Sequence, residues 1–357
     1  ALSGRNAAAT ANMQGNYFGT APFLITPCQG FNASVGKDSI WCDANNDTTA
    51  TIAAIKAGQI GAVVIVAGLF SEGTPSADES EGHDRTALTL PVNQDAYITG
   101  IAAAAAAMSP PIKVTLVLMS GSALDVTTAK VDSNVGAIMW CGYPGQSGGA
   151  AIADAVFGVT NPSGRLTTTW YPQAFADKVR LDDYSMRPNA TSGNPGRSHR
   201  FYTGTPVYSF GAVLSYTEWS TTAPIVRMEK HAIATARREA TEGTTRAASV
   251  VVGTVEVFLQ NVGDRAGANS VMLFAAAPVD ATRRAAEGTP LHALVSFEKV
   301  MLAPQESTTL RFDVKAHALL WANRTGHRVV AEGEWTFWTG TAADRDTEEA
   351  ATHVVLV

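Results

Sequence analysis

The first 160 residues alternate between apolar β-branched runs and segments with helical periodicity. The predicted strands are residues 62–67, 112–119 and 137–141, and the predicted helices are 48–57, 90–107 and 150–157. Unbroken apolar runs of this length are typical of strands that are covered on both faces, as in parallel sheets. Strands that alternate with helices at this spacing predict βαβ crossovers, and therefore an α/β sandwich with a mostly parallel sheet in residues 1–160.

The pattern changes after residue 160. Residues 161–227 are rich in Pro, Gly and aromatic side chains, and we expect ordered coil that wraps other surfaces. From residue 228 the apolar period becomes two, and the predicted strands are residues 250–259, 270–275, 293–302, 308–314, 327–338 and 352–357. Short strands separated by turn signals predict an all-β sandwich of the fibronectin-III or immunoglobulin-like type in residues 228–357.

Composition and charge narrow the classes of function. The chain has 357 residues, 46% of them hydrophobic and only 16% charged, which is typical of a globular protein of about two to three domains. Its net charge of −6 gives no electrostatic reason to expect nucleic acid or an anionic membrane as a partner. No apolar run approaches the roughly 20 residues that span a bilayer. We therefore expect neither nucleic acid nor a membrane as a partner.

The cysteines and asparagines favour secretion. Cys28 and Cys42 flank a polar loop and could form a disulfide worth about 3 kcal/mol, whereas Cys141 lies in an apolar run and is expected to fill core. Asn-x-Ser/Thr glycosylation acceptor sites occur at Asn32, Asn46, Asn189 and Asn323. Together these features predict a secreted, extracellular glycoprotein.

The loop after the strand at 62–67 concentrates acidic side chains. They are Glu72, Asp78, Glu79, Glu81 and Asp84, and Arg85 follows them. Ligands bind beyond the carboxyl ends of the strands in open α/β sheets, so this loop lies where chemistry is expected. A carboxyl that stays protonated near neutral pH needs burial or a nearby negative charge, which Glu79 and Glu81 could supply for each other. A solvated loop without function is the simpler alternative, and Asp84 and Arg85 are expected to pair or to close the loop.

Two other kinds of site carry weaker signals. Gly145-Gln-Ser-Gly-Gly149 fits the serine-hydrolase elbow pattern, with His199 as an available base, but Gly142, Tyr143, Pro144 and Gly145 intervene between the preceding strand and the serine. Ser147 is more simply a helix N-cap. The histidines show no metal-ligand spacing with cysteine or with each other, and no dinucleotide or phosphate-loop pattern is present. We therefore expect no metal and no cofactor.

Several long motifs resemble family 3 glycoside hydrolases. Ser80-Glu-Gly-His-Asp-Arg-Thr86 followed by Leu90-Pro-Val-Asn-Gln94 resembles the acid/base loop of that family. Similarity to the fungal-type β-xylosidase branch extends over residues 13–23, 140–149, 187–197 and 201–211. Residues 295–304 are similar to the fibronectin-III-like domain that closes these enzymes. The resemblance covers nearly the whole chain.

The resemblance implies the C-terminal part of a retaining exo-β-xylosidase that acts on the non-reducing ends of xylo-oligosaccharides. Glu81 is implied as the general acid/base, with Glu79 as second choice and Glu72 as third. Glu79 and His83 are candidates for lining the substrate pocket. The nucleophilic aspartate and most of the sugar pocket would lie in an N-terminal (β/α)8 barrel, which residues 1–61 are too few to form. We therefore expect the isolated chain to be inactive.

Two alternatives stay open. The same two domains could form a non-catalytic carbohydrate-binding or scaffolding protein. Within the enzyme interpretation, the sequence does not distinguish xylose from arabinose or glucose, because the barrel would supply most of the pocket that selects the sugar.

Overall fold

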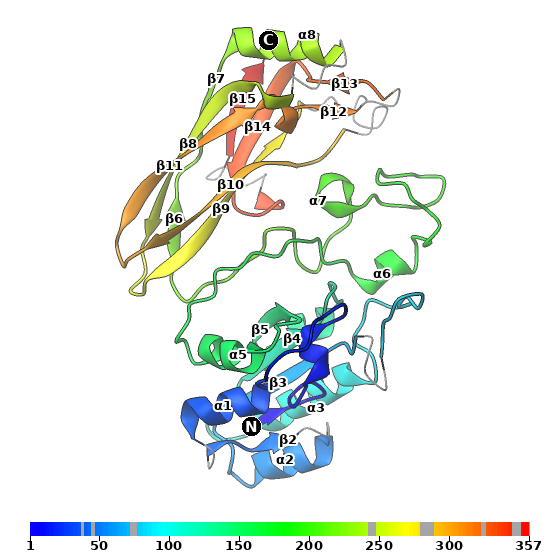
Figure 1. The fold of residues 1–357 in the computed structure, drawn as a ribbon, viewed down its shortest axis with the longest axis vertical. Helices are drawn as coiled ribbons and strands as arrows, with labels where there is room; N and C mark the ends of the chain where they lie inside the picture. The colour runs from blue at the N-terminus through cyan, green and yellow to red at the C-terminus, as the bar shows by residue number, and fades with distance from the viewer. Residues whose placement is uncertain are drawn as a thin grey trace. The chain divides into compact units, whose positions relative to one another are not determined.

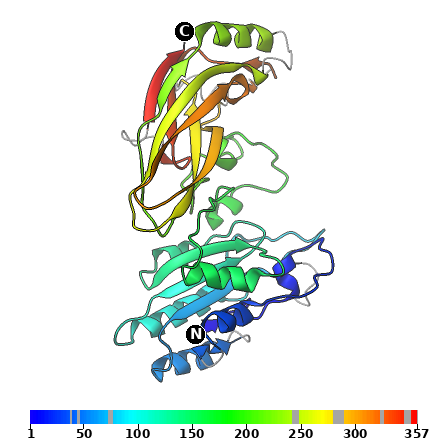
Figure 2. The ribbon, with the colours of Figure 1, turned by 60° about the vertical axis from the view of Figure 1, so that its left-hand side comes forward.

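The structure is a computed structural model that describes residues 1–36, 39–43, 47–71, 77–241, 248–278, 289–322, 326–344 and 351–356. The chain divides into two compact units. Unit 1 comprises residues 1–160 with 171–176, and unit 2 comprises residues 161–170 with 177–357. Figures 1 and 2 show the elements of each unit.

Unit 1 is built on a five-stranded sheet whose strand pairs are all parallel. The strands lie in the order β2 (Cys42–Asp43), β1 (Leu2–Ser3), β3 (Val63–Gly68), β4 (Val114–Met119) and β5 (Val135–Gly142). Around them are α1 (Pro27–Val35), α2 (Thr48–Lys56), α3 (Gln94–Ala106), α4 (Thr127–Val131), α5 (Gly148–Val156) and the 3₁₀ helix η1 (Ala11–Gln14). The predicted α/β unit with a parallel sheet is confirmed.

Helices cover both faces of this sheet. On one face, Val64 and Val66 of β3 share a core cluster with residues of α1 and α5. All residues of β3 are buried, so the alternate side chains, such as Ile65, are covered as well. Helices α2 and α3 pack against each other, and α3 also contacts β3 and β4. Coverage on both faces is the physical reason that β3 shows no polar alternation.

The start of α2 agrees with its prediction, whereas the starts of α1 and α3 do not. Helix α2 begins at Thr48, as predicted, and is capped by Asp47, whose carboxylate accepts from the Ala50 backbone N–H at 3.0 Å. Helix α1 was not predicted, although Thr26 and Gln29 form a complete capping box at its start. The helix expected at 90–107 begins later, at Gln94, because Val92 and Asn93 both adopt left-handed backbone angles.

The described residues of unit 2 form two larger antiparallel sheets that enclose a common core, and a third, two-stranded sheet in which β12 (Trp321–Ala322) pairs with β13 (Arg328–Val329). One larger sheet has the order β10 (Ala293–Leu302), β9 (Gly267–Ala276), β14 (Gly333–Thr339) and β15 (Ala351–Leu356). The other larger sheet has β11 (Ser307–Lys315), β8 (Val251–Asn261) and β6 (Trp219–Thr221), with β7 (Ile225–Met228) also paired to β8. The remaining elements are α6 (Gln173–Ala176, in unit 1), α7 (Ser198–Phe201), α8 (Lys230–Thr241) and η4 (Ala316–Ala318). The predicted all-β sandwich is confirmed.

Three predictions of local structure in this region were wrong. Strands β6 and β7 begin in the segment that was expected to lack regular structure. Helix α8 was missed, although Ile233, Ala236 and Ala240 are buried at helical spacing. The single strand expected at 327–338 is two strands, β13 and β14, and the second begins at Gly333 with a φ of 118°. Short strands and a lone amphipathic helix carry too few residues for a period to stand out.

The connecting stretch after residue 160 is ordered by contacts with the sandwich. Arg165 donates to the Gly211 carbonyl at 2.7 Å and to the carbonyl oxygen of Ser270 on β9. Trp170 is fully buried, and its backbone forms a bridge with Tyr208. These contacts join the connecting stretch to other parts of unit 2.

Candidate functional site

Four strands of unit 1 end at one edge of the sheet and deliver the residues of the candidate site. Strand β1 leads into Arg5, β3 into the acidic loop, β4 into Ser120 and Gly121, and β5 into Tyr143. In a parallel sheet these carboxyl ends lie at the same edge. The candidate site was expected at this edge, and the described part of the loop, residues 77–90, contacts all four strand ends.

Asn12 anchors the start of the loop. Its side chain donates to the Leu69 carbonyl at 2.8 Å and accepts from the Ser71 backbone N–H at 2.7 Å. It also donates to the side chain of Asn6 at 2.8 Å. Asn12 is only 3% exposed, so these bonds form in a desolvated environment where an unpaired amide would be costly.

Asp78 has a structural role. It accepts from the Phe70 backbone N–H at 2.7 Å, and its own N–H donates to the Phe70 carbonyl at 2.8 Å. Arg5 forms an ion pair with the Asp78 carboxylate and lies 3.8 Å above the centre of the Phe70 ring. Both side chains of the ion pair are almost fully buried. These contacts bring residues 70 and 78 together and fix the path of the loop that follows.

Glu79 is half-buried and points toward β4 and β5. It accepts a hydrogen bond from the Tyr143 hydroxyl at 2.9 Å. Burial and the Glu79 charge together raise the pKa of Tyr143 well above its usual value, so the phenol stays a donor. A Cβ on Gly121 would lie 2.9 Å from the Tyr143 ring, which explains why a glycine follows β4 here. The carboxylate of Glu79 is therefore held in place by the protein.

Glu81 lies at the tip of a tight turn. The backbones of Ser80 and His83 exchange hydrogen bonds of 3.2 and 3.0 Å, leaving Glu81 and Gly82 as the central residues. Gly82 has a φ of 75°, as a type II turn requires at its second central position. Glu81 is exposed, and its carboxylate accepts from the hydroxyl of Tyr17. The structure thus presents this carboxyl to solvent and orients it at the same time.

The other predicted site residues are placed as follows. His83 and Asp84 are exposed, and among the described residues Asp84 makes no ion pair. The expected pairing of Asp84 with Arg85 is therefore not seen. Arg85 instead donates to the Thr89 carbonyl at 2.5 Å and closes the loop. Burial lowers the pKa of Arg85, and the charges of Glu79 and Asp78 offset only part of this effect. Glu72 lies outside the described residues.

The end of the loop is tied to neighbouring strands. The Gln94 side chain both accepts from the Gly68 N–H at 2.9 Å and donates to the Gly68 carbonyl at 2.8 Å. Thr89 forms a parallel bridge with Asp125, and Asp125 accepts from the Gln173 backbone N–H at 2.7 Å. Gln94 in the Leu90–Gln94 motif therefore has a structural explanation, because it satisfies the backbone where β3 ends.

Tyr17 and Tyr143 are site residues that sequence reasoning did not assign. Tyr17 is 81% exposed, and Phe18 and Phe23 nearby in the chain are about half exposed, at 47% and 50%. Large exposed aromatic side chains that occur close together mark an interaction surface. The available signals were the position of Tyr143 directly after β5 and of Tyr17 inside a motif that resembles the family.

The alternative sites receive no support. Ser147 occupies the N-cap position of α5 but makes no capping hydrogen bond, and it lies five residues beyond β5. His199 stacks on Phe210 in unit 2, with ring centres 4.2 Å apart. Among the described residues no cluster of His, Cys, Asp and Glu could hold a metal ion. None of the described helices is long and apolar enough to cross a membrane.

The cysteines follow the predicted division. Cys28 and Cys42 form a disulfide whose Cα atoms are 6.1 Å apart. Cys141 is a free thiol packed against the core, where burial raises its pKa to about 12. Of the glycosylation acceptors, Asn189 is exposed on a loop, Asn32 is half-buried within α1, and Asn46 and Asn323 lie outside the described residues.

The described residues thus form a parallel α/β unit with an acidic loop at its carboxyl edge, followed by a β-sandwich. Residues 1–216 match the glycosyl hydrolase family 3 C-terminal domain, and residues 270–343 match the fibronectin type III-like domain. The chain therefore belongs to glycosyl hydrolase family 3, as its motifs predicted.

Proteins named as β-xylosidases are among the relatives of this chain. Beta-D-xylosidase 3 of Arabidopsis thaliana is 37% identical, with 96% of this chain and 44% of that protein covered. Beta-xylosidase/alpha-L-arabinofuranosidase 2 of Medicago sativa subsp. varia is 34% identical, with 95% and 43% covered. The solved structure of a family 3 exo-beta-xylosidase (XlnD) in complex with a xylobiose aziridine probe matches the whole chain and 45% of its own, with a TM-score of 0.80 at 29% identity. This chain thus spans less than half the length of these relatives and matches their C-terminal part.

Proposed function

We propose that this chain supplies the general acid/base, Glu81, of a retaining β-xylosidase. The observation that carries the proposal is the exposed turn at the carboxyl edge of the sheet, where Tyr17 orients the Glu81 carboxylate without covering it. A carboxyl in this position can reach a sugar that is held by another part of the enzyme. The nucleophilic aspartate would belong to a (β/α)8 barrel outside these 357 residues.

Glu81 is a better candidate than Glu79 because of what each carboxylate contacts. Each glutamate accepts a hydrogen bond from a tyrosine hydroxyl, but Glu79 and its donor Tyr143 are half-buried, whereas Glu81 and its donor Tyr17 are exposed and open to a substrate. Glu81 would protonate the leaving oxygen while the aspartate attacks the anomeric carbon, and would then remove a proton from the water that releases the sugar. Retaining chemistry requires the two carboxyl groups to lie about 5–5.5 Å apart, so the loop would cover the mouth of the barrel. The exposed Tyr17, Phe18 and Phe23 would pack against the barrel there.

The proposed substrates are xylo-oligosaccharides cleaved from their non-reducing ends. The support is the similarity to proteins named as β-xylosidases. The name of the Medicago relative also includes α-L-arabinofuranosidase, so arabinosides are the second candidate substrate class.

The test is Glu81→Gln in the enzyme that joins this chain to its barrel, with Asp84→Asn as the control in the same loop. Turnover of xylobiose should fall by about 10²–10⁴-fold, the usual contribution of a general acid. Turnover of an aryl xyloside with a good leaving group should fall much less, because that group needs no proton, and azide should restore its rate. Asp84→Asn should leave both rates nearly unchanged.

Equal losses on both substrates, without rescue by azide, would remove Glu81 from this role. Rescue of Glu79→Gln instead would transfer the role to Glu79. The 357-residue chain alone should hydrolyse neither substrate, because a lone acid has no nucleophile, and clear turnover by it would contradict the proposed division of the active site.

We further propose that the protein is secreted, which the Cys28–Cys42 disulfide supports because such bonds persist in oxidising compartments. Mass spectrometry of native protein under non-reducing conditions should find this disulfide, with glycan on Asn189. Reduced cysteines and an unmodified Asn189 would contradict the proposal.

A further inference from the structure

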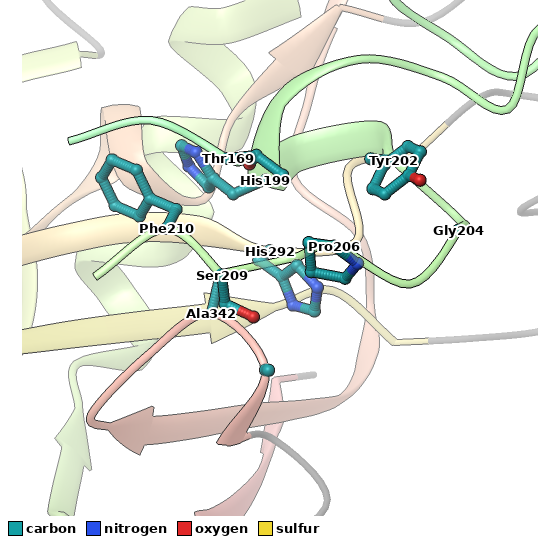
Figure 3. A pocket seen from close by; sticks show the side chains of 10 residues that line it. Thr169, His199, Tyr202, Gly204, Pro206, Ser209, Phe210, His292 and Ala342 are labelled. Atoms are coloured by element: carbon teal, nitrogen blue, oxygen red, sulfur yellow. The ribbon is translucent and has the colours of Figure 1, made fainter. Parts of the chain in front are cut away.

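Unit 2 contains a cavity of about 150 Å³ that the proposed active site does not use. Its lining includes Thr169, His199, Tyr202, Ser209, Phe210 and His292, which come from four separate stretches of the chain. Figure 3 shows these side chains grouped around one space. All of them belong to unit 2, so the cavity is complete within that unit.

Hydrogen bonds between its walls hold the cavity open. The bridge between Trp170 and Tyr208 sets Thr169 beside Ser209. The Leu291 N–H donates to the Arg200 carbonyl at 2.6 Å, which fixes the segment that carries His292. The Ala342 N–H donates to the Phe210 carbonyl at 3.0 Å and brings a further loop to the wall. Small-molecule sites are usually preformed in this way.

The hydroxyl of Thr169 is the observation that indicates a bound ligand. It is only 7% exposed, and among the described residues its hydroxyl has no hydrogen-bond partner. Buried hydroxyl groups are nearly always hydrogen-bonded, since an unpaired one loses its bonds to water without replacement. A polar ligand in the cavity would supply the missing partner.

The imidazole of His199 adds a polar group suited to a neutral ligand. Its ring stacks on Phe210 and lies edge-on to Phe274. Burial, together with the charge of Arg200, lowers the pKa of His199 to about 4. The ring is therefore neutral near pH 7, with one nitrogen that donates and one that accepts, which matches a sugar hydroxyl and gives no preference for an anion.

The size of the cavity restricts the ligand further. A cavity of about 150 Å³ accommodates a six-membered ring, as an engineered apolar cavity of that size binds benzene. This cavity differs because hydroxyl and imidazole groups line it together with Phe210 and Pro206. A mixed lining of this kind suits a six-membered ring that carries hydroxyl groups and has apolar C–H faces.

We propose that this cavity is a binding site for a monosaccharide in its pyranose form, with a pentose preferred over a hexose. The choice of a sugar among hydroxylated rings rests on the proposed function, in which the enzyme releases pentoses. A pentose fits better because a hexose carries an additional hydroxymethyl group into a small space. About ten non-hydrogen atoms limit the affinity, so a millimolar Kd is expected.

The test is a titration of the 357-residue chain with xylose, followed by the NMR signals of the histidine rings. The signals of His199 and His292 should shift and saturate at millimolar xylose. Those of His231, His317 and His353, which do not line the cavity, should stay in place. Glucose should bind several-fold more weakly, and glycerol should give no saturating shift.

Two variants locate the binding. Thr169→Val keeps the shape but removes the unpartnered hydroxyl, so the chain should stay folded and its Kd for xylose should rise about 5–10-fold, the loss expected for one hydrogen bond. Tyr202→Phe should weaken binding by a similar factor, whereas Tyr216→Phe, outside the cavity, should not. Circular dichroism and thermal unfolding confirm that each variant is folded.

Absence of a saturating shift up to about 100 mM xylose, far above the expected Kd, would show that the cavity holds only water and would overturn the proposal. If Thr169→Val and Tyr202→Phe both bound xylose with the Kd of the unchanged chain, the proposal would be overturned as well. Glu81→Gln should leave xylose binding unchanged. Failure of this site with normal Glu81 kinetics therefore affects only this inference, and failure of Glu81 with normal binding affects only the proposed function.

Discussion

The acidic loop of unit 1 and the cavity of unit 2 present polar groups in opposite ways. In the loop, Asp78 and Glu79 are tied to Arg5 and Tyr143, and Glu81 remains exposed on its turn. In the cavity, wall segments hydrogen-bonded to one another enclose a buried, unpartnered hydroxyl of Thr169. In the proposed function an exposed acid needs a second surface that brings it a substrate, whereas all residues that line the cavity belong to unit 2. Under the two proposals, this chain carries part of one site and the whole of another.

The largest effect on the loop is expected from Gly68→Ala at its base. Gly68 has a φ of 130°, and a Cβ there would lie 2.0 Å from the Met119 carbonyl oxygen. Both the clash and the left-handed backbone oppose any side chain, so we expect a loss of about 4 kcal/mol or more in the free energy of unfolding. Urea unfolding of the 357-residue chain measures it. Gly82→Ala is the control, because nothing lies within 4 Å of its Cβ and only backbone strain of about 1 kcal/mol remains. Similar losses for both variants would show that the base of the loop is not its rigid part.

The free energy of unfolding should fall in acid because of His199, the half-buried histidine that lines the cavity of unit 2. His199 has a folded pKa of about 4, below its ordinary value of 6.5, so the unfolded chain binds more protons between these values. Stability therefore falls as the pH is lowered through this window, by about 2 kcal/mol between pH 7 and pH 5. Urea unfolding at both pH values, compared with His199→Gln, checks this sign and size. The replacement should reduce the pH dependence, and His353→Gln, at an exposed position, should not. An unchanged slope in His199→Gln would contradict the assignment.

The smallest effects separate the two glutamates. Tyr143→Phe removes the donor to a half-buried carboxylate, so we expect a loss of about 1–3 kcal/mol in the free energy of unfolding. Tyr17→Phe removes a bond on the surface and should change it by less than about 0.5 kcal/mol. In the enzyme with its barrel, Tyr17→Phe should instead lower kcat, because Tyr17 orients the proposed acid. Thermal unfolding and xylobiose turnover test the two effects. A reversed order, with Tyr17 important for folding and Tyr143 for turnover, would favour Glu79 as the acid.

Much of the architecture was predictable because burial leaves a direct record in the sequence. Strand β3 is apolar throughout because helices cover both faces of its sheet, and β8 and β11 alternate because one face of their sheet meets the core. Helix α8 and strands β6 and β7 were not predictable in the same way. Strands β6 and β7 are stabilised by pairing with β8, and helix α8 by packing on β8 and β13. These contacts form only when the chain has folded.

The candidate site was predictable in its place and only partly in its contacts. The carboxyl end of β3 and the turn residues Glu81 and Gly82 could be identified from sequence, because strand order and glycine conformation follow local rules. The partners of the acids could not, since Tyr17 and Tyr143 lie 64 residues from the glutamates they contact. The cavity could not be predicted, because residues 199–210 form a cavity only together with Thr169, His292 and Ala342, which are far from them in the sequence.

The sequence by itself determined the two-part architecture, the family and the loop that carries the acids. These depend on periodicity, turn chemistry and long motifs, each of which is a local property of the sequence. Only the tertiary structure decided which acids are held and which is exposed, and that Thr169, with its unpartnered hydroxyl, lines a cavity. Those properties depend on contacts between side chains that are distant in the sequence, and the pattern of apolar and polar residues does not specify such contacts.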